Sequence, residues 1–182
     1  MGNAAYAAGL CLLMADDRDG AAEWFLRAAD RYRESYALAP PASWGRLIGA
    51  VKARLLAGDA DGLTRDAQWT LDEHAAQADS PIGRYAACLA LLVRDRRTEA
   101  RVLADDLRTH EGFPSDVADA LAFIAAGDLV GYDVAVESVL ESFETRDDYL
   151  EDVPVADTVL VLQALAARRG FTTELESELL PA

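Results

Sequence analysis

The stretch Leu13-Met14-Ala15-Asp16-Asp17 closes one apolar run just before another begins, and variants of it recur along the chain. They are Leu56-Ala57-Gly58-Asp59, Leu92-Val93-Arg94-Asp95 and Ala125-Ala126-Gly127-Asp128. From Asp17 the aspartates follow at separations of 42, 36 and 33 residues. Such a period is the length of one helical hairpin, so the sequence predicts a series of stacked hairpins.

The composition favours helices throughout. Of the 182 residues, 36 are Ala and 25 are Leu, against 12 Val and 3 Ile. Ala and Leu are good helix formers, whereas strands favour β-branched and aromatic residues. The length suits one domain, so we expect a single all-α domain over residues 1–182.

Apolar periodicity, turn residues and capping residues predict about nine helices. Ser43 and Ser115 are expected to cap two of them. The last helix is expected to be buried on nearly all sides, because the run Val159-Leu160-Val161-Leu162 leaves little polar face. The predicted ranges are 4–14, 21–37, 43–57, 63–76, 82–93, 98–109, 116–126, 129–145 and 154–169.

The first predicted hairpin also matches part of the tetratricopeptide pattern. Gly9, Ala21, Phe25 and Ala28 stand at the expected offsets, whereas later hairpins match less well. The sequence therefore predicts a degenerate tetratricopeptide-like α-solenoid. Solenoids of this kind present a concave face that binds other proteins.

The charge is concentrated in the second part of the chain. Residues 1–100 carry 14 acidic and 12 basic side chains, whereas residues 101–182 carry 18 acidic and 5 basic ones. Nucleic acids and anionic membranes bind Lys- and Arg-rich surfaces, so neither is an expected partner. A salt-adapted surface would also be acidic, but it would be acidic along the whole chain.

The sequence predicts a cytoplasmic protein. No apolar run approaches the roughly 18 residues that span a bilayer, and no basic residue precedes the first apolar stretch as in a secretory signal. Cys11 and Cys88 stand alone in apolar helical patterns and are expected to be buried thiols, without a disulfide or zinc site.

No recognised catalytic motif is present, and we expect neither an enzyme nor a cofactor. The segments starting at Asp17 and Asp59 resemble the middle of a calcium loop. Both lack the first oxygen ligand and the closing Glu that such a loop needs, so they are interpreted as turns and no metal site is predicted.

One constellation of acidic residues is conspicuous near the predicted helix 129–145. Spacings of 4, 4, 3 and 4 are expected to align five carboxylates on one helix face. These are Asp133, Glu137, Glu141, Glu144 and Asp148. Three further acids, Asp147, Glu151 and Asp152, extend the group. These eight residues form either a solvated surface or a docking site for a basic protein, and they are our candidate partner-binding residues.

The second part of the chain contains a series of short motifs. They are Ser43-Trp44-Gly45, Leu55 to Asp59, Ala125 to Asp128 with Tyr132 to Glu144, Val159 to Gly170 and Glu176 to Pro181. Together these motifs resemble the immunity protein 49 family of polymorphic toxin systems. The similarity covers about residues 43–182 and departs from the family in a shorter N-terminal region and at Leu179, where an aromatic residue is usual.

The resemblance implies a non-enzymatic immunity protein that binds a cognate toxin and blocks its active site. An acidic helical surface would suit a basic toxin, such as a nuclease. The first alternative is a tetratricopeptide-like scaffold that holds proteins in its concave groove. The second is a helical domain with a pocket for a small molecule. Trp24, Trp44 and Trp69 are expected in the core, or else as interface anchors. The sequence does not indicate the oligomeric state.

Overall fold

The computed structural model describes residues 2–182 and contains, within that range, nine α-helices, two short 3-10 turns and no strand. This confirms the all-α prediction, and each expected helix is present with its ends shifted by at most four residues. The helices are α1 (Gly2–Met14), α2 (Arg18–Tyr36), α3 (Trp44–Leu56), α4 (Ala60–Asp72), α5 (Pro81–Val93), α6 (Arg97–Leu107), α7 (Ser115–Ala126), α8 (Leu129–Glu144) and α9 (Asp157–Ala167). The 3-10 turns are η1 (Ala75–Gln77) and η2 (Leu150–Asp152).

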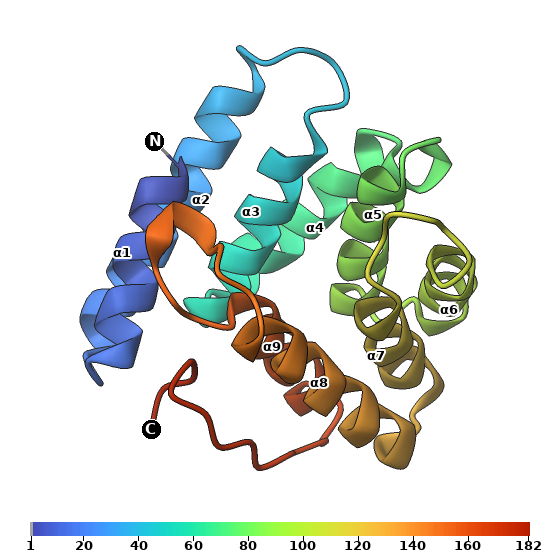
Figure 1. Cartoon of the computed structure of the whole chain (residues 1–182). Coiled ribbons are helices and arrows are strands. Elements are labelled where there is room, and N and C mark those ends of the chain that lie inside the picture. Colours follow the sequence, from blue (N-terminus) through green and yellow to red (C-terminus); the bar gives the residue numbers. More distant parts are fainter. Residues whose placement is uncertain (1) are drawn as a thin grey trace.

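The first eight helices form four consecutive hairpins. Helix α1 packs on α2, α3 on α4, α5 on α6 and α7 on α8, and the second helix of each hairpin contacts the first helix of the next. Figure 1 shows these pairs following one another around a curved stack. The predicted arrangement of stacked hairpins is therefore confirmed.

The recurring aspartates have a common structural role in three of the four hairpins. Each lies before the second helix and accepts a hydrogen bond from the backbone N–H of a glycine three residues later, which satisfies one of the free amides of the first turn. The pairs are Asp17 with Gly20, Asp59 with Gly62 and Asp128 with Gly131, each at 3.0 Å.

The cap that Asp59 forms leaves room only for glycine at position 62. A Cβ atom at Gly62 would lie 2.1 Å from Oδ2 of Asp59. The third hairpin departs from the pattern, because Arg96 immediately precedes α6 and Asp95 takes a left-handed backbone conformation with a φ of 58°.

Other local predictions were wrong. Ser43 does occupy the N-cap position of α3, but its hydroxyl donates to the carbonyl oxygen of Pro40 at 2.7 Å and makes no capping hydrogen bond. Pro114 occupies the capping position expected for Ser115, which begins α7. Cys88 is buried, which raises its pKa to about 12, but Cys11 is exposed. Helix α1 is apolar around most of its circumference, so spacing alone did not indicate its outward face.

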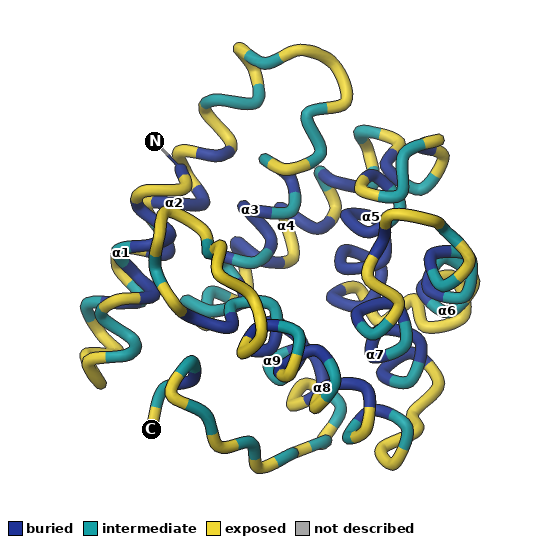
Figure 2. Tube along the Cα trace, viewed as in Figure 1, coloured by how far each residue is buried: buried dark blue, intermediate teal, exposed yellow. Residues whose placement is uncertain are grey.

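Helix α9 closes the fold. It packs against α3, α7 and α8, so it covers the side of the stack that the first helices of the hairpins line. Figure 1 shows it beside α8 in the lower middle of the molecule, and most of its residues are buried or half-buried (Figure 2). The prediction of a nearly fully buried last helix is confirmed. The inner face expected to bind other proteins is therefore occupied, in part, by the chain's own helix.

Replacing Leu162 with Ala tests this packing. Leu162 is fully buried, so we expect a loss of about 2–5 kcal/mol in the free energy of unfolding, measured with urea. As a control, Leu38→Ala removes the same atoms from a side chain that is 91% exposed and should change stability by less than about 0.5 kcal/mol. Equal effects of the two substitutions would contradict a buried α9.

Candidate functional site

The structure separates the eight predicted acidic residues into two groups. Asp133, Glu137, Glu141 and Glu144 lie on α8, as expected, and its opposite face is buried against the core. Helix α8 ends at Glu144, so the prediction that Asp148 continues the same helix face was wrong. The other four acids lie in the 145–156 loop.

The four acids of the loop group are exposed, but they do not continue the face of α8. Asp147 and Asp148 follow α8 directly, whereas Glu151 and Asp152 belong to η2, which packs against α1. The last two have φ values of 53° and 59°, which non-glycine residues adopt rarely. The chain thus turns sharply at η2 before it returns to begin α9.

The C-terminal segment of residues 171–182 lies beside the acidic face of α8. The Thr173 hydroxyl donates a hydrogen bond to Asp133, and the Ser177 hydroxyl donates one to Oε1 of Glu144 at 2.7 Å. The N–H of Ala156 donates to the carbonyl oxygen of Leu179 at 2.9 Å, which joins the segment to the start of α9.

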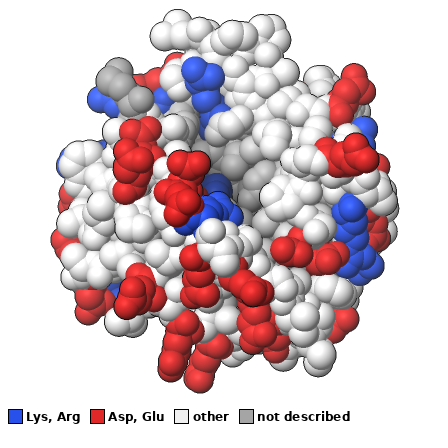
Figure 3. All heavy atoms as spheres, in the orientation of Figure 1, with Lys and Arg blue, Asp and Glu red and all other residues white. Residues whose placement is uncertain are grey.

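This segment adds three acidic residues that the sequence reasoning missed. Burial alternates along it, and Glu174, Glu176 and Glu178 all point outward. The signal was present as a Glu at every second position, which is the period of an extended strand-like segment rather than of a helix. Figure 3 shows acidic side chains gathered along the lower edge of the molecule, where this segment runs in Figure 1.

The acidic residues in this part of the chain are almost all unpaired. Of the 13 Asp and Glu residues from Asp128 onward, only Asp157 forms an ion pair within the described residues. The one nearby arginine, Arg146, instead donates to the backbone of Ser142 and lies over the ring of Phe143, 3.6 Å from its centroid. The surface of α8 and the C-terminal segment therefore keeps its full negative charge.

The first half of the chain is different, because its carboxylates are widely paired. Arg54 binds Asp30, Asp59 and Asp66, and Arg33 also pairs with Asp66. Asp66 is only 2% exposed, so these contacts join α2, α3 and α4 at a buried charge. Acidic residues there serve the fold, whereas those on α8 have no basic partner within the described residues.

A second charged cluster lies under η2, where α9 begins. The Nζ atom of Lys52, the only lysine, lies 2.7 Å from Oδ2 of Asp157, and both side chains are largely buried. The Tyr6 hydroxyl donates to the same oxygen at 3.4 Å. Burial, the largest single cause, lowers the pKa of Lys52, but Asp157, Tyr85 and Tyr32 together raise it by more, so the ammonium stays charged. This pair anchors α9 to α3.

Tyrosines surround the pair and share its buried setting. The Tyr32 hydroxyl donates to Oδ1 of Asn3 at 2.8 Å. Burial is the main reason that the pKa of Tyr32 rises to about 12 and that the pKa of Tyr6 lies well above its ordinary value. The cluster thus combines the ion pair of Lys52 and Asp157 with two tyrosines, Tyr6 and Tyr32, that stay protonated near neutral pH.

None of the three tryptophans is fully buried. Trp24 is 36% exposed, with Arg27 stacked 4.9 Å from its ring centroid, and Trp44 and Trp69 are half-buried. The core prediction was therefore wrong for Trp24 and only partly right for the other two.

Among residues 2–182, no three His, Cys, Asp or Glu side chains are grouped as metal ligands. None of the helices in the described chain offers an apolar stretch of the length that a bilayer requires. Comparisons with protein-family models, with curated proteins and with solved structures found no match to this chain.

The ion pair predicts a specific stability defect. Asp157→Asn leaves the Lys52 ammonium without its counter-charge, so we expect a loss of about 3 kcal/mol in the free energy of unfolding. Adding Lys52→Met removes that charge and should recover at least half of the loss. Chemical unfolding of both single variants and the double variant measures the coupling. Purely additive effects would show that the pair does not anchor α9.

The buried tyrosines predict a loss of stability in alkali. Unfolded tyrosines ionise near pH 10, whereas folded Tyr32 ionises near pH 12, so ionisation favours the unfolded chain between these values. The free energy of unfolding should therefore fall as the pH rises from 10 to 12. Phenolate absorbance at 295 nm follows the ionisation of the tyrosines in the folded state. Titration of Tyr32 near pH 10, identified by comparison with Tyr32→Phe, would contradict its buried position.

Proposed function

We propose that this chain is a non-enzymatic binding protein that docks a basic partner protein on the acidic surface of α8 and the C-terminal segment. The observation that carries the proposal is the absence of ion pairs along this surface in the described chain, together with extensive pairing in the first half. Complementary charge raises association rates and selects partners.

Glu137 and Glu141 form the centre of the proposed surface, because both are exposed and follow one another along α8. Like charges four residues apart weaken a helix by about 0.2–0.5 kcal/mol per pair. The hydrogen bonds from Thr173 and Ser177 fix the side chains at the two ends of the row, Asp133 and Glu144. The two ends of the row are thus held in place, which reduces the entropy that they lose on binding.

The resemblance to the immunity protein 49 family gives this partner a proposed identity. The chain would act as an immunity protein in the cell that produces a basic toxin, possessing no chemistry of its own and covering the toxin's active site. The intracellular setting that this role requires is part of the same proposal.

The alternative function, a scaffold with an open concave groove, is less well supported. Helix α9 occupies the side of the stack against α3 and α7, where a tetratricopeptide-like groove would lie. A groove-binding scaffold would have to displace a helix whose central residues are fully buried. We therefore favour binding through the outer acidic surface.

Neutralising the row on α8 tests the proposal. The triple variant Glu137→Gln, Glu141→Gln and Glu144→Gln keeps side-chain shape and removes three charges. We expect it to fold at least as stably as the parent, because repulsion is relieved. Its association with the partner should slow about tenfold or more at low salt, with a flatter salt dependence. The partner is first isolated by affinity capture with the parent from the native organism, and the rates are then measured by stopped flow.

The matched control is Asp61→Asn, Asp79→Asn and Glu111→Gln, which changes the net charge equally at exposed acids away from α8. This control should associate almost as fast as the parent. An α8 variant that binds as fast as the control at low salt, and protects cells from the captured protein equally well, would exclude this surface as the docking site.

A further inference from the structure

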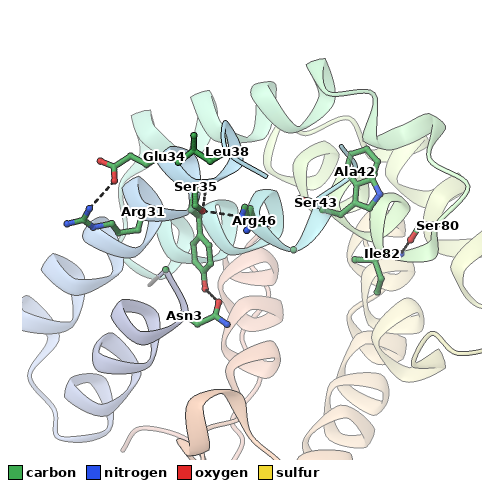
Figure 4. Close-up of a pocket in the computed structure, with 14 residues that line it drawn as sticks. Asn3, Arg31, Glu34, Ser35, Leu38, Ala42, Ser43, Arg46, Ser80 and Ile82 are labelled. Carbon is green, nitrogen blue, oxygen red and sulfur yellow. Dashed lines mark hydrogen bonds and ion pairs between the residues drawn. The ribbon is translucent and has the colours of Figure 1, made fainter. Parts of the chain in front are cut away.

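A cavity of about 800 Å³ opens where α9 does not cover the stack. Its walls come from the start of α1, the last turns of α2, the 37–43 segment and the first residues of α3 and α5. Figure 4 shows Arg31 and Glu34 at one end, Ser80 and Ile82 at the other, and Arg46 between them. Its size lies within the range of about 300–1,000 Å³ that is typical of small-molecule sites.

Arg46 gives this cavity an uncompensated positive charge. Its Nε donates to Oγ of Ser35 at 3.1 Å, and the rest of its guanidinium makes no ion pair or hydrogen bond within residues 2–182. The other arginine of the wall, Arg31, pairs with Glu34 at 3.1 Å. The side chains lining the cavity therefore carry one net positive charge in a protein whose formal net charge is −15.

The same cavity has an apolar side that the fold does not use. Leu38 is 91% exposed and Ile82 is 43% exposed, although both are large aliphatic side chains. The half-buried indole of Trp44 also lines the cavity. An unpaired guanidinium together with unburied apolar surface is the arrangement that fixes one charged and one apolar part of a ligand.

We propose that this cavity binds a small amphipathic carboxylate, such as an aryl or acyl acid. The carboxylate would pair with the free nitrogens of Arg46, and the apolar group would cover Leu38, Ile82 and Trp44. This site is separate from the acidic docking surface and uses none of its residues. The two proposals therefore stand or fall independently.

The test uses 8-anilinonaphthalene-1-sulfonate, an aromatic anion, with N-phenyl-1-naphthylamine as its uncharged analogue. On the folded full-length protein we expect one saturable site for the anion by fluorescence and calorimetry. 1-Naphthoate, which carries a carboxylate, should displace the anion from that site. Arg46→Gln should weaken binding of the anion about tenfold or more and leave the uncharged analogue almost unaffected. Circular dichroism confirms that the variant is folded.

The matched control is Arg65→Gln. Arg65 is exposed, lies outside the cavity and forms no ion pair within the described residues, so its replacement should leave binding unchanged. A second variant, Leu38→Asp, adds a negative charge and removes apolar surface at a position that the fold does not bury. It should weaken binding of both the anion and its analogue. Equal loss of anion binding in the Arg46 and Arg65 variants, no effect of Leu38→Asp, or failure of 1-naphthoate to compete would overturn the proposal.

Discussion

The structure depends on the burial of α9 among α3, α7 and α8. Four hairpins in a row leave apolar surface on the side lined by their first helices, and α9 covers the part of it formed by α3 and α7. In a simple repeat protein each repeat contacts only its neighbours. Here α9 joins hairpins far apart in the sequence, and its first residue, Asp157, is tied to Lys52 across 105 positions. The fold is therefore a stack of hairpins whose inner side is covered in part by its own last helix.

The placement of charge follows from this closure. Where carboxylates lie between helices, as Asp66 does between Arg33 and Arg54, they are paired and stabilise the contact between hairpins. Helix α8 is near the end of the stack, and its outer face meets only the C-terminal segment, which contributes hydroxyl groups and further glutamates. The contrast between paired and unpaired acids makes α8 the surface on which we base the proposed function.

The helices were largely predictable, because Ala and Leu dominate and the Asp-Gly caps mark the hairpin turns locally. The nearly all-apolar pattern of α9 likewise predicted its burial. What sequence could not supply was the arrangement of distant segments. Nothing near Thr173 indicates that it meets Asp133 on α8, and nothing near Lys52 names Asp157 as its partner.

The candidate site, like the fold, could be predicted from the sequence only where local spacing decides the structure. The spacing of Asp133, Glu137, Glu141 and Glu144 identified one helix face correctly, but extending the same spacing to Asp148 assumed one more helical turn. The chain leaves the helix at Glu144. The cavity beside Arg46 was not predictable either, since its walls come from α1, α2, α3 and α5 and no local pattern marks them.

The position of α9 also affects how the protein is made. The hairpins from α1 to α8 leave the ribosome before the helix that covers their inner side has been synthesised. Until then the apolar faces of α3 and α7 stay open, and Lys52 lacks its counter-charge. Unfinished chains with exposed apolar surface aggregate or are retained by chaperones. A chain interrupted before residue 157 therefore exposes apolar surface that α9 covers once that helix has been made.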